Sequence, residues 1–194
     1  VDGPPEDDRT KTIQETFVKV AEVPEIQSRS GLNTHREEVL QFLHEKTFGA
    51  FPGEPVRLDI HREFRTLDGG PYGNDVYSFV PEEDWRLEVD VRWRQPKNTA
   101  SPTVLVLRSR DEDRWESESF VSGLDDGWNI AYFETRGTGE NGWSPGLQWH
   151  IRRAAAWTGR TIASMQVYDV LRCLEALRRL DGVDPESVVI AGRD

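Results

Sequence analysis

The sequence predicts an α/β fold, with a mostly parallel, doubly wound sheet, antiparallel strands toward its N-terminus and flanking helices. Three observations support this class. Two early runs alternate apolar and polar residues, which is typical of half-buried antiparallel strands. Three later runs are almost entirely apolar, as strands buried on both faces of a parallel sheet are. Helical patterns separate these later runs, so strand and helix alternate along the chain.

The first 32 residues are expected to form an arm or linker. Residues 1–27 are polar and interrupted by proline, and only residues 17–20 are apolar enough to lie along a domain surface as a wrapped arm. We therefore divide the chain into an arm, residues 1–32, and part of one α/β domain, residues 33–194. The chain length suits one domain or part of a larger one.

A capping signal and the alternation of apolar and polar residues predict the first helix and strands of the domain. Thr34 and Glu37 have the spacing of a capping box, which predicts a helix from Thr34 to about Lys46. The alternating runs predict antiparallel edge strands at residues 56–67 and 85–93.

The apolar runs predict three inner strands, at residues 103–107, 128–133 and 187–192. Helices are expected at residues 114–124, 148–158 and 161–180. In the last of these helices, six positions predict one apolar face: Val167, Val170, Leu171, Leu174, Leu177 and Leu180.

Composition argues against nucleic acid and membrane as partners. The net charge is −11 and the pI is near 4.9, whereas phosphate binding depends on clustered Lys and Arg. The local arginines are expected on solvated helix faces: Arg152, Arg153, Arg160, Arg172, Arg178 and Arg179. No apolar stretch is long enough to span a membrane. The compartment stays open, and secretion or the periplasm would fit if a leader were removed upstream of Val1.

No metal or cofactor is expected. A lone Cys173 excludes an intramolecular disulfide and a Cys-based zinc cluster within this chain. His35 and His44 are nine residues apart, unlike the four-residue spacing of a helical zinc pair, and His61 and His150 are also expected to be surface or packing residues. The glycines after residue 136 lack the spacing of a dinucleotide or phosphate loop.

The run Arg136, Gly137, Thr138, Gly139, together with residues 184–192, resembles α/β-hydrolases of the acetyl xylan esterase and prolyl oligopeptidase-like group. In that family an Arg-Gly-x-Gly loop ends the strand before the helix that precedes the nucleophile strand. The resemblance covers residues 56–194, and residues 48–52 are also similar to the start of such esterases. It implies a partial α/β-hydrolase fold, the N-terminal half, ending at the nucleophile elbow.

The nucleophile elbow of this fold has the pattern Gly-x-Ser-x-Gly. On that pattern Gly192 is the first glycine, Arg193 is the variable residue and Asp194 stands where the serine belongs. Three interpretations remain open: Asp194 is a carboxylate nucleophile, the elbow is degenerate in a non-catalytic homologue, or the register is shifted. Whether the chain belongs to an enzyme is therefore open.

The rest of the catalytic machinery is only partly visible. Residues 107–113, where the resemblance places an oxyanion-hole N–H, contain no glycine and are densely charged, although one main-chain N–H can still serve. The triad acid and histidine would follow Asp194. For the loop of Arg136, Gly137 and Gly139 we expect a structural role, in which the guanidinium holds nearby carbonyls and carboxylates.

Ser144 lies in a second stretch that matches Gly-x-Ser-x-Gly, at residues 142–146. It is interpreted as a loop residue because it lies well after a strand and is followed by proline instead of a helix start. Three nearby tryptophans fit either a sugar-stacking cleft or ordinary core packing: Trp143, Trp149 and Trp157.

The leading hypothesis is a fragment of an esterase-like α/β-hydrolase. The resemblance implies carboxylic ester hydrolysis on acetylated plant polysaccharide. This chain alone is expected to be inactive, and its partner would be the missing C-terminal half of the domain, in the same or a separate chain. The alternative is a non-catalytic, hydrolase-like module with a degenerate elbow that binds carbohydrate or a partner protein.

Overall fold

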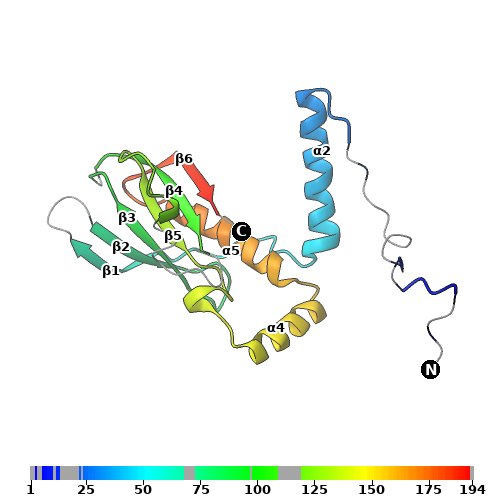
Figure 1. Cartoon of the computed structure of the whole chain (residues 1–194). Coiled ribbons are helices and arrows are strands. Elements are labelled where there is room, and N and C mark those ends of the chain that lie inside the picture. The colour runs from blue at the N-terminus through cyan, green and yellow to red at the C-terminus, as the bar shows by residue number, and fades with distance from the viewer. Residues whose placement is uncertain are drawn as a thin grey trace. The chain divides into compact units, whose positions relative to one another are not determined.

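The computed structural model describes residues 3, 6–10, 12–13, 22, 24–67, 73–96, 98–108 and 119–192. The chain forms two compact units, Val1–Gln41 and Phe42–Asp194. The main elements of both units are drawn in Figure 1. The apolar residues 17–20 lie outside the described residues, so the predicted wrapped arm remains a prediction, as do the predicted domain boundaries.

The helix of the first unit, α2 (Arg29–Phe42), begins before the predicted start at Thr34. The oxygen Oγ of Ser28 accepts the backbone N–H of Gly31 at 3.0 Å, which caps the helix at Ser28. The predicted capping box at Thr34 was therefore wrong. The second unit begins at Phe42 and opens with a π-helical turn, η1 (Leu43–Phe48).

The second unit contains a six-stranded sheet in the order β1-β2-β3-β5-β4-β6. The strands are β1 (His61–Leu67), β2 (Gly73–Phe79), β3 (Leu87–Trp93), β4 (Ser101–Leu107), β5 (Asn129–Phe133) and β6 (Val183–Ala191). The first three strands and β5 pair antiparallel, whereas β4 pairs parallel with both β5 and β6. This mixed sheet with flanking helices confirms the predicted fold class.

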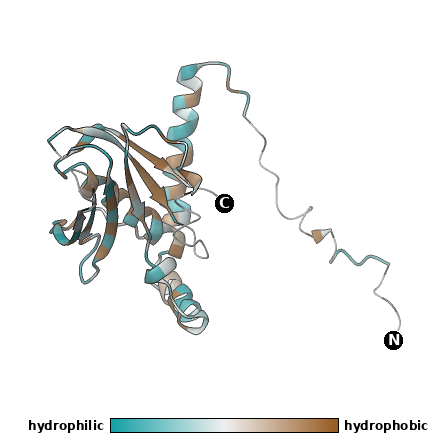
Figure 2. Cartoon of the chain, turned by 60° about the vertical axis from the view of Figure 1, so that its left-hand side comes forward, coloured by the Kyte–Doolittle hydropathy of each residue, from teal (hydrophilic) through white to brown (hydrophobic). Residues whose placement is uncertain are grey.

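The two central parallel strands are buried on both faces, as their uninterrupted apolar runs predict. On one face Leu105 and Phe133 pack into a core that includes Cys173 of the last helix, and on the other face Val106 and Ile130 form a smaller core. Figure 2 shows the hydrophobic residues concentrated along these strands. Because successive strand residues face opposite sides, one short run supplies both cores.

The antiparallel part of the sheet differs from the prediction in three ways. Strand β2 was not predicted, because it begins with Gly73, Asn74 and Asp75, which are unfavourable strand residues that pairing on both sides outweighs. Strand β3 is an inner strand between β2 and β5, so the prediction that it lies at the edge was wrong. Strand β1 does lie at the edge, and it begins only at His61.

Strand β6 pairs with β4 but lies at the edge of the described sheet. The sequence predicts an inner, buried strand there, yet Val189 and Ile190 are about half exposed, at 45% and 50%. Within the described residues no strand pairs with the outer edge of β6, so its side chains have strand neighbours on one side only. The apolar run therefore predicted a parallel strand correctly but its burial incorrectly.

Helices α4 (Pro145–Trp157) and α5 (Ile162–Leu177) connect β5 to β6. Helix α4 starts earlier than predicted, because Ser144 caps it and proline is favoured in the first turn. Thr161 and Ser164 form a reciprocal capping box at the start of α5. Residues 114–118 of the helix predicted at residues 114–124 lie outside the described residues. Of the rest, only residues 119–120 are helical and a turn follows at 121–123, so the prediction of a helix up to residue 124 was wrong.

The buried face of α5 is rotated from the predicted one. Val167 and Leu171 are exposed, whereas Asp169 and Arg172 are turned inward. Arg172 is only 3% exposed, and its guanidinium donates to the carbonyl of Val56 and pairs with Glu175. The prediction of a solvated Arg172 was therefore wrong, because polar tertiary partners determine which side of α5 faces the sheet.

Asn129 joins three parts of the sheet. Its Oδ1 accepts the N–H of Arg94 at 3.1 Å, and its Nδ2 donates to the carbonyl of Gly182 at 3.1 Å. The same carbonyl accepts the N–H of Ser101 at 3.1 Å. Asn129 is almost fully buried, so water does not replace these bonds.

Replacing this buried amide tests the arrangement. Asn129→Ala is expected to lower the free energy of unfolding by about 2–4 kcal/mol, because the Arg94 N–H loses its acceptor and the Gly182 carbonyl loses a donor. Denaturant unfolding followed by circular dichroism measures the change. The control is Asn98→Ala at an exposed amide, which should change stability by less than about 0.5 kcal/mol. Equal effects of the two substitutions would contradict the structural role of Asn129.

Candidate functional site

The parallel strands β5, β4 and β6 end at the same edge of the sheet. Leu107 of β4 pairs with Phe133 of β5, and Val106 pairs with Ala191 of β6. The residues that follow these strands, Arg108, Glu134 and Gly192, therefore come together at this carboxyl edge. Ligands of open α/β sheets bind at such an edge.

Gly192 is exposed at the carboxyl edge, and a methyl group in place of its hydrogen would make only an ordinary contact, 3.9 Å, with Leu107. Its neighbours therefore do not require glycine at this position. Arg193 and Asp194 lie outside the described residues, so the assignment of Asp194 to the nucleophile position remains a prediction.

Arg108 was not singled out by the sequence, and among the described residues it is the arginine that directly follows a parallel strand at the carboxyl edge. Its guanidinium lies 4.7 Å from the ring centroid of Tyr132, and its Nη1 is 3.4 Å from Glu134 Oε1. In the part of the chain that the structure describes, its Nε and Nη2 are buried without a hydrogen-bond acceptor. Buried donors without partners are costly, so this side chain is suited to binding an incoming acceptor.

Arg108 borders a polar hollow of about 580 Å³ at the carboxyl edge. The hollow is lined by carboxylates and other polar groups from three strands and the following loop: Arg86, Glu88, Asp90, Arg108, Glu134, Glu140 and Asn141, with Val76 and Tyr132. Carboxylates accept hydrogen bonds and arginine donates them. The lining is therefore suited to a neutral ligand with several hydroxyl groups.

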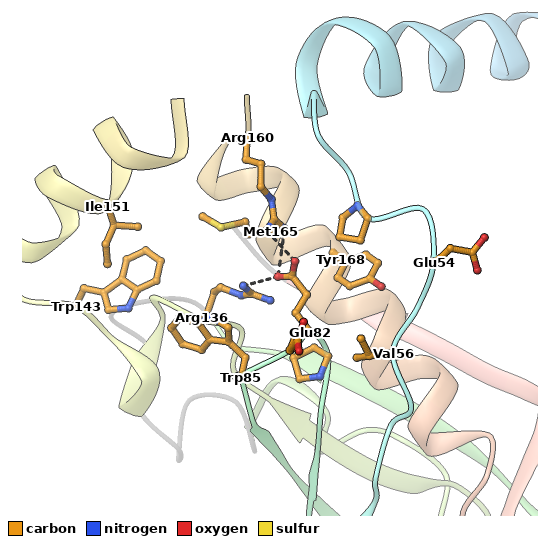
Figure 3. A pocket seen from close by; sticks show the side chains of 13 residues that line it. Glu54, Val56, Glu82, Trp85, Arg136, Trp143, Ile151, Arg160, Met165 and Tyr168 are labelled. Atoms are coloured by element: carbon orange, nitrogen blue, oxygen red, sulfur yellow. Dashed lines mark hydrogen bonds and ion pairs between the residues drawn. The ribbon is translucent and has the colours of Figure 1, made fainter. Parts of the chain in front are cut away.

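Arg136 belongs to the loop that follows β5, and it is buried, with only 2% of its surface exposed. Its Nε is 3.0 and 2.9 Å from the two carboxylate oxygens of Asp169, and its backbone N–H donates to Oδ2 at 3.0 Å. Its Nη1 is 2.7 Å from Glu82 Oε2, and Glu82 also pairs with Arg160 at 2.7 Å. Figure 3 shows Glu82 between the two arginines. The guanidinium thus joins the loop to α5 and to the turn before β3.

The two glycines of the loop have left-handed backbone angles and close neighbours. Gly137 has φ 81°, and a Cβ there would lie 2.8 Å from the Trp143 ring. Gly139 has φ 49°, and a Cβ there would lie 2.2 Å from the Glu134 carboxyl group, which accepts the N–H of Glu140 at 2.8 Å. Side chains at either position would displace these groups.

A second hollow, of about 400 Å³, lies over Arg136. Figure 3 shows Trp85, Trp143, Arg160 and Tyr168 around it. The guanidinium carbon of Arg136 lies 5.0 Å from the Trp85 ring centroid, a cation–π distance. Trp143 therefore lines a cavity, and whether this cavity stacks sugars remains a prediction. Arg136 contributes positive charge that Glu82 and Asp169 balance.

The charges around Arg136 shift the pKa values of their partners. Burial alone would raise the pKa of Glu82, but hydrogen bonds and positive charge from Arg160 and Arg136 outweigh it and hold that pKa below its ordinary value. Burial lowers the pKa of Arg136, but its hydrogen bonds with Asp169 raise it. The net effect is a pKa above the ordinary value for arginine. Arg136 therefore stays positively charged at neutral pH.

The remaining predicted residues lie apart from the carboxyl edge. Ser144 caps α4, with its Oγ 3.4 Å from the N–H of Leu147, so the second Gly-x-Ser-x-Gly stretch is a helix start and not a strand-to-helix elbow. The expectation that no helix begins at Pro145 was wrong. The four histidines have separate local neighbours: His35 with Glu38, His44 with Phe48 and Phe51, His61 with Asp59, and His150 with Trp149.

Among the residues that the structure describes, no group of three or more His, Cys, Asp and Glu side chains is arranged to hold a metal ion. No helix in those same ranges has the length and apolar character needed to cross a bilayer.

Comparison with known proteins identifies the fold but no sequence relative. No protein-family model matches the chain, and no curated protein matches it. Among solved structures, it is similar to a proposed acetyl xylan esterase from Bacteroides fragilis, with a TM-score of 0.64 and 14% identity over 84% of this chain and 47% of that protein. It is also similar to a glucuronoyl esterase from Solibacter usitatus, with a TM-score of 0.62 and 14% identity over 93% of this chain and 59% of that protein.

A third similar structure, acetyl xylan esterase 1 from a Thermoanaerobacterium species, has a TM-score of 0.54 and 16% identity over 72% of this chain and 46% of that protein. These esterases are α/β-hydrolases, so the chain has an α/β-hydrolase-type fold. The chain spans about half the length of the structures that it matches. The predicted resemblance is confirmed for the fold.

The buried arginine can be tested by a double-mutant cycle. Arg136→Met is expected to lower the free energy of unfolding by about 3–5 kcal/mol, because it leaves the Asp169 carboxylate buried without its partner. Arg136→Met combined with Asp169→Leu should be less destabilised than the sum of the single variants. Chemical denaturation measures all three, with the exposed Arg57→Met as the control. Simple additivity of the two substitutions would contradict a coupled pair.

The lowered pKa of Glu82 predicts a pH dependence of stability. Because the pKa is lower in the folded than in the unfolded state, the carboxylate stabilises the fold above its ordinary pKa of 4.5, and this contribution is lost as pH falls through the folded value. Glu82→Gln should therefore lose less stability than the parent between about pH 5 and pH 3. Thermal unfolding across that range measures the difference. Glu83→Gln, at an exposed neighbouring carboxyl group, should follow the parent.

Proposed function

We propose that this chain forms part of a carboxylic ester hydrolase that acts on acylated carbohydrate. The observation that carries the proposal is the carboxyl edge of an α/β-hydrolase-type sheet, where Arg108, Glu134 and Gly192 follow three adjacent strands. The chain contributes a six-stranded sheet and the loop anchored by Arg136. It also supplies one wall of a site for hydroxyl-bearing ligands.

The chemistry needs groups that the described residues do not bring together. Attack on an ester carbonyl requires an activated nucleophile, a base and donors for the developing oxyanion. In this proposal Asp194, two residues after Gly192, holds the nucleophile position. Among the described residues, Arg108 has two buried donors without an acceptor at the same edge. None of the four histidines is among the residues that line the hollow beside Arg108. We therefore propose that this chain is inactive alone and that the remaining half of the domain, in the same or a separate chain, supplies the acid and histidine.

Carbohydrate is the proposed substrate class for two reasons. The solved structures of similar fold include acetyl xylan esterases and a glucuronoyl esterase, whose names denote esters of xylan and of a glucuronoyl group. The hollow at the carboxyl edge is lined by carboxylates and an arginine, which hydrogen-bond hydroxyl groups without needing a charged ligand. An acetyl ester on such a chain would bring its carbonyl to the edge where Arg108 lies.

A second candidate function is a non-catalytic module that binds carbohydrate. The observation that favours it is Asp194, where a hydrolase with this elbow has serine. In this alternative the same hollow retains its hydroxyl-binding groups while the reaction is lost.

Hydrolysis of 4-nitrophenyl acetate and release of acetate from acetylated xylan test the proposal. The chain alone is expected to show no turnover above the uncatalysed rate, whereas a longer polypeptide that contains it should hydrolyse both esters. In that longer polypeptide Arg108→Met should lower kcat by about 10²-fold, if the guanidinium stabilises the oxyanion as other donors do. Turnover by this chain alone that Asp194→Ala abolishes would refute its inactivity. Binding of xylan without hydrolysis by the longer polypeptide would favour the second function.

A further inference from the structure

The outer face of α4 has a composition that packing does not explain. Trp149, Arg153 and Trp157 are spaced four residues apart, so they lie on one side of the helix. Ala155, the one buried residue of α4, is two residues from Arg153 and Trp157 and therefore lies on nearly the opposite side. The tryptophans are 54% and 81% exposed. Two large aromatic side chains thus lie in solvent on the side of α4 that faces away from its packing contact.

The arginine between them is held by the two rings. The guanidinium carbon of Arg153 lies 4.5 Å from the ring centroid of Trp149 and 5.8 Å from that of Trp157. Both distances are within cation–π range. In the described ranges of the chain, Arg153 has no ion pair and no side-chain hydrogen bond. Its planar set of N–H donors is therefore oriented in advance and unoccupied, which is the arrangement that binds a carboxylate through two bonds.

The charge of α4 is opposite to that of the whole protein. The helix contains Arg152, Arg153 and His150 but no Asp or Glu, whereas the chain has a net charge of −11. A local cationic face attracts an anionic partner, whereas the net charge of −11 on each copy makes two copies of the chain repel each other. The partner that fits this face is therefore anionic and offers flat, partly apolar surfaces to the tryptophans.

We propose that Trp149, Arg153 and Trp157 form a binding site for a carboxylate-bearing saccharide, a chain of uronic acid residues. Each such residue combines a carboxylate with a sugar ring whose C–H groups pack on an aromatic face, which matches a guanidinium between two indoles. The tryptophans are eight residues apart, or about 12 Å along the helix, so the site spans more than one sugar ring. The choice of carbohydrate rests on the proposed function, whereas the anionic character rests on the geometry and charge of α4.

The site differs from the hollow at the carboxyl edge. None of its three residues lines that hollow, and the hollow contains more carboxylates than arginines, so it does not attract an anion. The face of α4 would therefore bind the polysaccharide without taking part in the reaction, and it would hold the substrate chain while the ester reaches the carboxyl edge.

Isothermal titration calorimetry, which measures the Kd of this chain for a galacturonic acid trimer, tests the site. The trimer is expected to bind, and Arg153→Leu should weaken binding by about tenfold, as loss of a charge-assisted pair does. Trp157→Ala should weaken it by about fivefold, and xylotriose, which lacks carboxylates, should bind at least about tenfold more weakly than the trimer. The controls are Arg57→Leu and Phe64→Ala, an exposed arginine and an exposed aromatic side chain on other elements, which should bind like the parent.

Several results would overturn the inference. The inference fails if the trimer does not bind, if the α4 variants bind it as well as the parent does, or if xylotriose binds as well as the trimer. Tight binding of an oligoglutamate peptide of the same charge would assign the face to an acidic protein instead. A sedimentation mass that falls on Trp157→Ala would assign it to a second copy. Because binding is measured without hydrolysis, uronate binding by a protein that cleaves no ester would refute only the proposed enzymatic function, and ester cleavage without uronate binding would refute only this site.

Discussion

The buried pair of Arg136 and Asp169 is the interaction on which the arrangement of the second unit depends. It links the loop after β5 to the middle of α5, and through Glu82 it also reaches the turn before β3 and Arg160. Such a pair contributes little net stability, since both charges lose water, but it cannot be broken on one side without a large cost. Its main effect is therefore on position: it determines how α5 is rotated against the sheet and where the chain leaves β5.

Sequence periodicity predicted the burial of the central strands correctly but not which face of α5 is buried. The uninterrupted apolar runs of β4 and β5 predicted strands buried on both faces, and both cores contain their residues. The apolar stripe of α5 predicted a buried Val167 and Leu171, but the helix turns Asp169 and Arg172 inward to reach Arg136 and the Val56 carbonyl. Hydrophobic patterns do not record a long-range polar partner, so the helix was predicted and its orientation was not.

The site was predictable to a similar extent. The Arg-Gly-x-Gly loop could be found from its letters, because two left-handed glycines beside Trp143 and Glu134 leave a clear trace in sequence. Arg108 could not, because in the sequence it is one charge in a charged segment. Only the pairing of β4 with β5 places it beside Glu134. The dense charge that argued against an oxyanion hole thus includes Arg108, whose two unpaired donors can bind an oxygen ligand.

Cys173 has a further consequence for how this molecule can be studied. It is fully buried in the core between α5 and the sheet, and burial raises the pKa of its thiol. It is also the one cysteine of the chain. A thiol in this position reacts only when the helix separates from the strands, so its rate of modification reports how often that opening occurs. Cys173 is therefore an internal reporter of local unfolding at the contact between α5 and the sheet, which the pair of Arg136 and Asp169 orients.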